Sequence, residues 1–136
     1  MTPARDLVVG WEPKEDPMQT TSKFENLIVW QRARRLAADI YRFVRASAIA
    51  NDFPFRDQIQ RAAVSVAANI AEGAERGNRN EFAYFLRIAK ASAGELRCHL
   101  ILACDIGLCP TAAALRLQDE IAQIGRMLGA LIRRQT

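Results

Sequence analysis

The stretch from Gln58 to Leu100 constrains the fold most strongly, because it has the pattern of two helices joined by a short turn. Apolar residues in its first part recur with the three- and four-residue spacing of one helix face: Ile59, Ala63, Val66 and Ile70. This pattern stops between Gly73 and Gly77, where glycine allows the positive φ that ends many helices. Asn78 then provides a cap residue, with Glu81 three positions later, so a new helix begins there. The stretch predicts a tight antiparallel helical hairpin.

One further helix is predicted on either side of this hairpin. The four expected helices cover about residues 26–48, 55–75, 79–106 and 112–134. Pro54 separates the first two because proline cannot continue a helix, and Gly107 with Pro110 separates the last two. The third helix repeats apolar residues every seven positions, as the seam of a bundle does: Phe82, Ala89, Leu96 and Ala103. Short connections between four helices predict an all-α, antiparallel up-down-up-down four-helix bundle.

Residues 1–23 differ from the rest of the chain in composition. They contain three prolines, charges of both signs and the polar run from Gln19 to Ser22. Such a segment cannot bury a periodic apolar face, so we expect a flexible N-terminal tail. The bundle domain is expected over residues 24–136, and either Met1 or Met18 can serve as the translation start.

The positive charge is concentrated in the expected bundle. The chain has a net charge of +4, and residues 1–23 carry three basic and four acidic residues, so residues 24–136 hold a net +5. All basic residues after Lys23 are arginines except Lys90, and arginine binds phosphate bidentately. The candidate nucleic-acid-binding residues lie on the first helix, relieved only by Asp39: Arg32, Arg35, Arg42 and Arg45. An ordinary solvated helix surface is the alternative interpretation.

Gly125 and Gly129 lie one turn apart, beside the apolar seam of the fourth helix. Each glycine costs a helix interior about 1 kcal/mol relative to alanine. Close approach of another backbone would explain them, and simple tolerance is the alternative.

The cysteines and the single histidine argue against a metal centre and a disulfide framework. Cys98, Cys104 and Cys109 are odd in number and lack paired-cysteine spacing, and His99 is the only histidine. We expect the cysteines to be small buried hydrophobes in a reducing compartment, and we expect no metal and no cofactor. No apolar run approaches the roughly 20 residues of a membrane span, so a soluble, cytoplasmic protein is expected.

Polar residues form a stripe beside the apolar faces of the second and third helices. The members of this expected polar network are Ser65, Asn69, Glu72, Arg76, Ser92 and Glu95. A catalytic site needs a nucleophile, a base in reach and an oxyanion site, and neither serine has the sequence of a strained nucleophile turn. We therefore predict a structural network and no enzymatic activity or small-molecule substrate.

Antiparallel pairing about the first loop brings Arg32 to the level of Glu72, and Arg35 to the level of Asn69. Arg32 is the partner we expect for Glu72. Arg76 is the alternative partner, provided that Gly73 does not end the helix first.

The sequence resembles the 23S rRNA-intervening-sequence proteins, also called four-helix-bundle proteins. The resemblance rests on Phe24-Glu25-Asn26-Leu27 with Trp30-Gln31, on the run from Gln58 to Gly73, and on later matches around Glu81-Phe82 and Glu95-Leu96. It implies a small bacterial protein that forms a homopentamer and has no established enzymatic activity. The family is distantly related to the accessory variability protein of diversity-generating retroelements, which works with a reverse transcriptase and its RNA. The resemblance therefore also implies a role of this kind.

Two functional hypotheses follow. In the first, the protein is a self-associating accessory factor that binds RNA, or an RNA-handling partner such as a reverse transcriptase or the ribosome. In the second, it is a protein–protein interaction scaffold with no nucleic-acid role. They differ in whether the arginines of the first helix form one exposed patch or are paired with acids.

Overall fold

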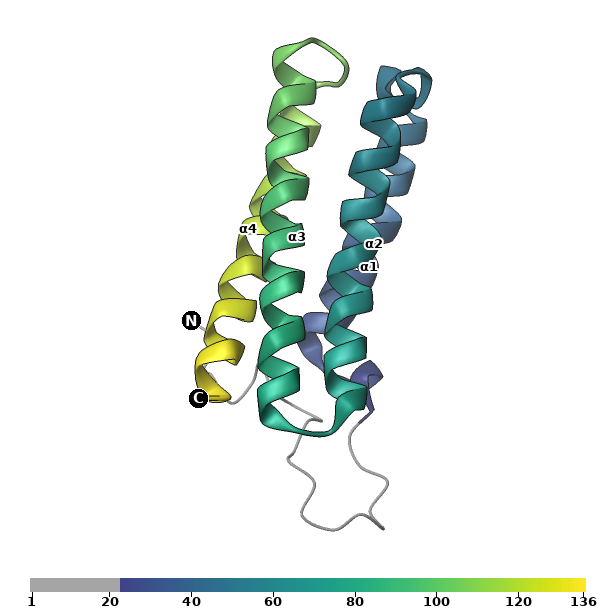
Figure 1. Cartoon of the computed structure of the whole chain (residues 1–136). Coiled ribbons are helices and arrows are strands. Elements are labelled where there is room, and N and C mark those ends of the chain that lie inside the picture. The colour runs from purple at the N-terminus through teal and green to yellow at the C-terminus, as the bar shows by residue number, and fades with distance from the viewer. Residues whose placement is uncertain (1–22) are drawn as a thin grey trace.

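The computed structural model describes residues 23–136, and the predicted bundle is confirmed there. Its order is a 3-10 turn η2 (Phe24–Asn26), helix α1 (Ile28–Arg45), a 3-10 turn η3 (Ala48–Asn51), and helices α2 (Phe53–Arg76), α3 (Arg79–Asp105) and α4 (Thr111–Arg134). The helices run antiparallel, with the α1–α2 and α3–α4 connections at one end and the α2–α3 turn at the other (Figure 1). The predicted tail lies outside the described residues except for Lys23, so it stays a prediction.

Helix α1 is shorter than predicted at both ends. Phe24–Asn26 forms a separate 3-10 turn, and the helix ends at Arg45. After it, the Ser47 hydroxyl accepts a hydrogen bond from the Ile49 amide at 3.3 Å and starts η3. The Ile49 side chain is buried, so this connection is anchored to the core.

Helix α2 begins two residues earlier than predicted. The Asp52 carboxylate caps it by accepting a hydrogen bond from the Phe55 amide at 3.3 Å. Pro54 therefore lies in the first turn, where its missing N–H leaves no helix bond unmade, and it does not act as a separator.

Gly73 does not help to end α2, which corrects the expectation for the turn. The helix continues to Arg76, and only Gly77, with φ of 79°, adopts the left-handed conformation there. Gly73 is needed for another reason, because a Cβ at this position would lie 2.8 Å from Cβ of Phe85. Helix α3 thus approaches α2 closely just before the turn.

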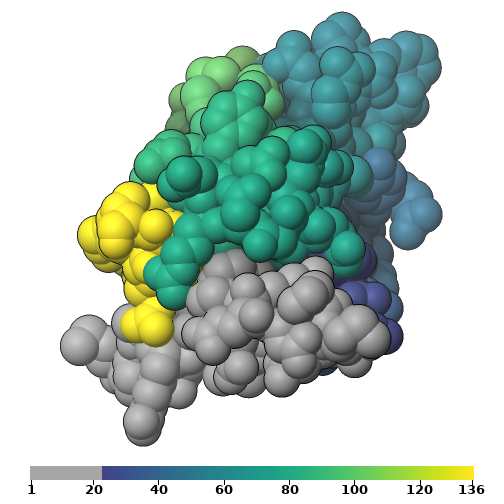
Figure 2. Space-filling view, turned by 60° about the horizontal axis from the view of Figure 1, so that its bottom comes forward, coloured from purple at the N-terminus to yellow at the C-terminus, as the bar shows by residue number. Residues whose placement is uncertain are grey.

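Helix α3 starts at the predicted cap. The Asn78 side chain accepts a hydrogen bond from the Glu81 amide at 2.9 Å and donates one to the Glu81 carboxylate at 2.6 Å. At the same end of the molecule, Arg79 donates to the Arg134 carbonyl at 3.1 Å, which ties the start of α3 to the end of α4. Figure 2 views this end, with the α2–α3 turn in the middle and the C-terminus of α4 beside it.

The core contains the predicted apolar stripes. The buried residues of α1 repeat at the predicted spacing, and the seven-residue series of α3 is buried throughout; the largest enclosed side chains include Leu36, Ile40, Phe82, Leu86, Leu96 and Leu100. From α4, Ile121, Ile124, Leu128 and Leu131 complete the core. Within residues 23–136, none of the helices combines the length and the apolar character needed to span a bilayer.

Candidate nucleic-acid interface

Arg32 does not contact Glu72, so the predicted ion pair between these two residues is wrong. Its guanidinium binds Glu120 of α4 through two hydrogen bonds, of 3.0 Å and 2.5 Å, and donates a third to Gln123 at 2.8 Å. The hydrogen bond to Glu120 raises the pKa of Arg32 above its ordinary value, although burial opposes this. Helix α1 has two neighbours at the same height, α2 and α4, and Arg32 lies on the side that faces α4.

The other predicted arginines of α1 remain on its surface but do not form a uniform cationic face. Arg42 pairs with Asp39 at 3.0 Å, with both side chains well exposed. Arg35 and Arg45 are exposed, and no acid within residues 23–136 pairs with either of them. With Arg32 turned toward α4, the predicted patch is reduced to two cations free of acidic partners in the described part.

The polar stripe divides into two separate groups. In the first, the hydroxyls of Ser65 and Ser92 lie 2.8 Å apart and join α2 to α3. The Asn69 amide donates to the Ser65 hydroxyl and to the Ser65 carbonyl, each at 2.9 Å. These three half-buried side chains are thus joined by hydrogen bonds, and buried polar groups generally need such partners.

The second group lies at the α2–α3 turn. Arg76 donates to Glu72 at 2.9 Å and to Glu81 at 3.4 Å, and its guanidinium also lies over the Phe85 ring. The contact with Glu72 forms because α2 continues through Gly73. Glu95 is exposed on α3 and joins neither group through any contact among the described residues.

The cysteines are less buried than predicted. Cys98 is exposed, while Cys104 and Cys109 are partly buried on either side of the α3–α4 connection. The sulfur atoms of Cys104 and Cys109 lie 3.5 Å apart. Burial, reinforced by this contact, raises the pKa of the Cys109 thiol to about 12, so it is a poor nucleophile near neutral pH.

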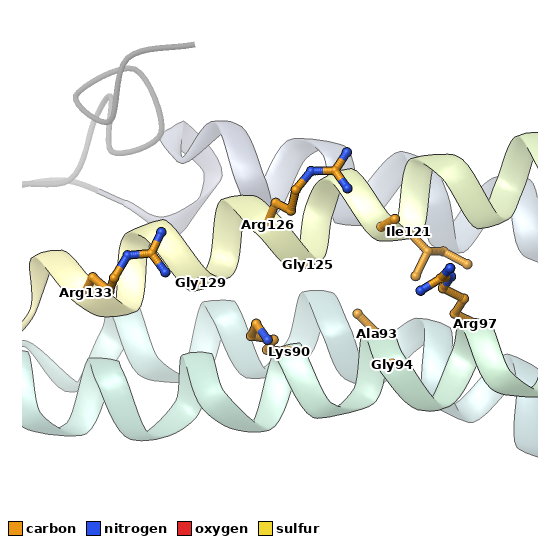
Figure 3. Close-up of a pocket in the computed structure, with 10 residues that line it drawn as sticks. Lys90, Ala93, Gly94, Arg97, Ile121, Gly125, Arg126, Gly129 and Arg133 are labelled. Carbon is orange, nitrogen blue, oxygen red and sulfur yellow. The ribbon is translucent and has the colours of Figure 1, made fainter. Parts of the chain in front are cut away.

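A groove of about 510 Å³ runs between α3 and α4 and is lined by four basic side chains. Lys90 and Arg97 of α3 and Arg126 and Arg133 of α4 line it, and in Figure 3 the Arg126 side chain extends over α4, away from α3. All four side chains are exposed, none forms an ion pair within residues 23–136, and no lining residue is acidic. The remaining lining residues are small or apolar: Ala93, Gly94, Ile121, Ala122, Gly125 and Gly129.

The glycines of this groove are not required by the fold itself. A Cβ on Gly94 or Gly125 would meet nothing within 4 Å, and neither has a positive φ. At Gly129 the nearest atoms belong to the groove side chains Lys90 and Arg133, at 3.4 Å and 3.6 Å. No backbone of another described helix comes within 4 Å of a Cβ at these three positions, so the close approach expected at Gly125 and Gly129 does not occur among residues 23–136.

The four groove cations were not predicted from the sequence, because the predicted binding residues were all arginines of a single helix. The available signal was their spacing. Lys90 and Arg97 are seven residues apart beside the seam of α3, and Arg126 and Arg133 are seven apart beside the seam of α4. Residues seven apart lie on the same face of a helix, so each pair marks one wall of a groove between neighbouring helices.

Comparison with known proteins identifies the chain's relatives. No curated protein matches the sequence. A crystal structure of a protein of unknown function from the S23 ribosomal protein family of Bacteroides thetaiotaomicron shares the fold, with a TM-score of 0.69 and 23% identity over 78% of this chain and 99% of that one. The family model of the 23S rRNA-intervening sequence protein matches residues 25–130. That match covers most of the chain, and the protein therefore belongs to the 23S rRNA-intervening sequence protein family.

Proposed function

We propose that the protein is a non-enzymatic, self-associating accessory factor that binds RNA through the groove between α3 and α4. The observation that carries this proposal is the set of four exposed cations without acidic neighbours in the groove. Arginine and lysine at such a site neutralise phosphates and release the counterions that surround a nucleic acid. The family name also links these proteins to ribosomal RNA genes.

Self-association is part of the proposal because apolar surface remains uncovered in the single chain. A second groove, of about 340 Å³, lies between α1 and α2 and is lined mainly by alanines and by Phe24, Trp30 and Val64. Such surface favours association with further copies of the same chain. In a homopentamer each protomer would contribute its own cationic groove, and several weak contacts with one RNA would add up to strong binding.

The arginines of α1 provide a second, weaker candidate for RNA contact. Arg35 and Arg45 are exposed without acidic partners in the described part, but Arg42 is neutralised by Asp39 and Arg32 by Glu120. A protein–protein scaffold is the alternative function. It is favoured by uncovered apolar surface such as the groove between α1 and α2, which does not explain the cations.

Two matched triple variants test the proposal. Replacing Arg97, Arg126 and Arg133 with glutamine removes three groove charges, and replacing Arg35, Arg42 and Arg45 with glutamine removes three charges from α1. We expect the groove variant to bind a fluorescently labelled RNA at least about 10-fold more weakly than wild type, with the slope of log affinity against log salt reduced by about 3. The α1 variant should lose less than about 3-fold.

Two other outcomes would change the proposal. Equal binding by the wild type and the groove variant, with binding lost in the α1 variant, would move the interface to α1. Absence of RNA binding by the wild-type protein at about 50 mM salt, where phosphate contacts are strongest, would reject the RNA function and leave the scaffold.

A further inference from the structure

We infer that the groove between α3 and α4 holds the sugar–phosphate backbone of base-paired RNA and does not read its sequence. This inference rests on the proposed RNA function and adds the class of RNA. It follows from what the groove contains and from what it lacks.

The groove offers no surface on which bases can stack. None of its ten lining residues is aromatic. The exposed aromatic rings of the described chain lie elsewhere and already have partners: Phe53 lies under the Arg56 guanidinium at 4.5 Å, and Tyr84 packs edge-on against Phe85 at 5.1 Å. Proteins that bind single strands rely on aromatic stacking platforms, so an unpaired RNA would gain little here beyond charge.

The groove also lacks hydrogen-bond acceptors, so the only base groups that it can contact are acceptors such as those of guanine. Its polar side chains are one lysine and three arginines, which donate hydrogen bonds and accept none. No asparagine, glutamine, serine or carboxylate lines it. In a base-paired RNA the major groove is too narrow for side chains, so the protein meets mainly phosphates and 2′-hydroxyls. Donors alone are suited to the phosphate oxygens.

The spacing of the cations suits a rigid ligand. Seven residues correspond to about 10.5 Å along a helix, so on each wall the Cα atoms of the two basic residues are held at that separation. A duplex holds its phosphates in place before binding, whereas a single strand must be ordered at the cost of conformational entropy. Figure 3 shows Lys90 and Arg126 near the middle of the groove, with Arg133 and Arg97 toward its two ends.

The floor of the groove lets a backbone come close. Side-chain atoms are absent above Gly94 and Gly125, where even a Cβ would meet nothing within 4 Å. A ligand backbone can therefore reach the surface of both helices beside the four cations that line the groove.

The first experiment compares three RNAs by fluorescence anisotropy with the full-length protein. The probes are two duplexes of about 16 base pairs with unrelated sequences, and an oligouridine of the same length that cannot pair. We expect the duplexes to bind within about 2-fold of each other and the single strand at least about 10-fold more weakly. Equal or tighter binding of the single strand, or a strong preference for one duplex sequence, overturns the inference while the RNA function stands. Failure of all three RNAs to bind rejects the proposed function itself.

The second experiment fills the floor without changing any charge. Gly125→Met places a long side chain in the groove, and Ala91→Met adds the same side chain on an exposed position of α3 that does not line the groove. We expect Gly125→Met to weaken duplex binding at least about 5-fold and Ala91→Met to leave it unchanged, because only the first occupies space beside the cations. Unchanged binding by a folded Gly125→Met protein would show that the duplex does not enter the groove.

Discussion

At the scale of single residues, the part-buried Arg32 makes four side-chain hydrogen bonds to α4. It joins Glu120, Gln123 and the Met127 sulfur and thereby links the first helix to the last. Its side chain is 24% exposed and that of Glu120 is 34% exposed, so solvent screens the pair only partly. We expect Glu120→Ala to lower the free energy of unfolding by about 1–3 kcal/mol, the range for removing one hydrogen-bond partner and leaving the other unsatisfied.

Double-mutant cycles measured by urea unfolding check this assignment. The Arg32–Glu120 cycle should give a coupling of about 1 kcal/mol or more, and the Arg32–Glu72 cycle should give a value near zero. Glu72 and Arg76, both about half exposed, should couple by only about 0.3–0.5 kcal/mol, as exposed helix pairs do. Coupling between Arg32 and Glu72 above that of Arg32 and Glu120 would contradict the observed pairing.

Alanine substitutions at two glycines distinguish the effect of helix packing on stability from the effect of helix propensity. Gly73→Ala places a Cβ 2.8 Å from Cβ of Phe85, so α2 and α3 must move apart, and we expect a loss of about 1–3 kcal/mol in stability. Gly125→Ala meets no neighbour and should stabilise the protein by up to about 1 kcal/mol. Thermal and urea unfolding followed by circular dichroism measure both. A Gly73→Ala protein more stable than wild type would mean that the two helices are not in close contact there.

At the scale of elements, the α3–α4 connection can be probed through Cys109. Its thiol pKa is raised from an ordinary 9.0 to about 12, so at pH 8 it is almost entirely protonated. We expect iodoacetamide to alkylate exposed Cys98 first and Cys109 last, as followed by peptide mass spectrometry. Rapid alkylation of Cys109 in the folded protein at pH 8 would contradict the burial of this thiol.

The same shift has a consequence for stability. Because the pKa is higher in the folded protein, the stability contributed by the protonated thiol is present below about pH 9 and is lost as the pH rises toward 12. Cys109→Ala should lack this alkaline loss, so the two unfolding curves should diverge only above pH 9.

The helices were the part of the structure that the sequence predicted best. Apolar residues spaced three, four or seven positions apart predicted the helices; in the third helix, Phe82, Leu86 and Leu96 must face a common core wherever the helix ends. The start of α2 was predicted two residues too late because proline can either break a helix or lie in its first turn, as Pro54 does here. Cys98 was predicted to be buried from its residue type alone, but it lies on the outer face of α3 and is exposed.

The candidate site was less predictable, for a geometric reason. Antiparallel pairing gives the height of Arg32 along the bundle, but at that height α1 has two neighbours, and only the rotation of the helix selects Glu120. The groove, in turn, is made by two helices together. Lys90 and Arg133 are 43 positions apart and acquire a common role only when α3 and α4 pack.

At the scale of the whole molecule, the proposal requires more than one copy of the chain. Light scattering should give a mass several times 15.2 kDa, and five times for a pentamer, because uncovered apolar surface such as the α1–α2 groove favours assembly. A monomer at micromolar concentration would remove the pentamer and the gain from multiple grooves.

The antiparallel course of α3 and α4 also gives the groove an approximate two-fold symmetry. Rotation by half a turn exchanges Lys90 with Arg126 and Arg97 with Arg133, since each helix carries two cations at the same spacing and the helices point in opposite directions. The two strands of an RNA duplex are related in the same way. A duplex whose two-fold axis coincides with that of the groove would therefore present the same phosphates in either direction, and the protein would bind it equally well both ways round.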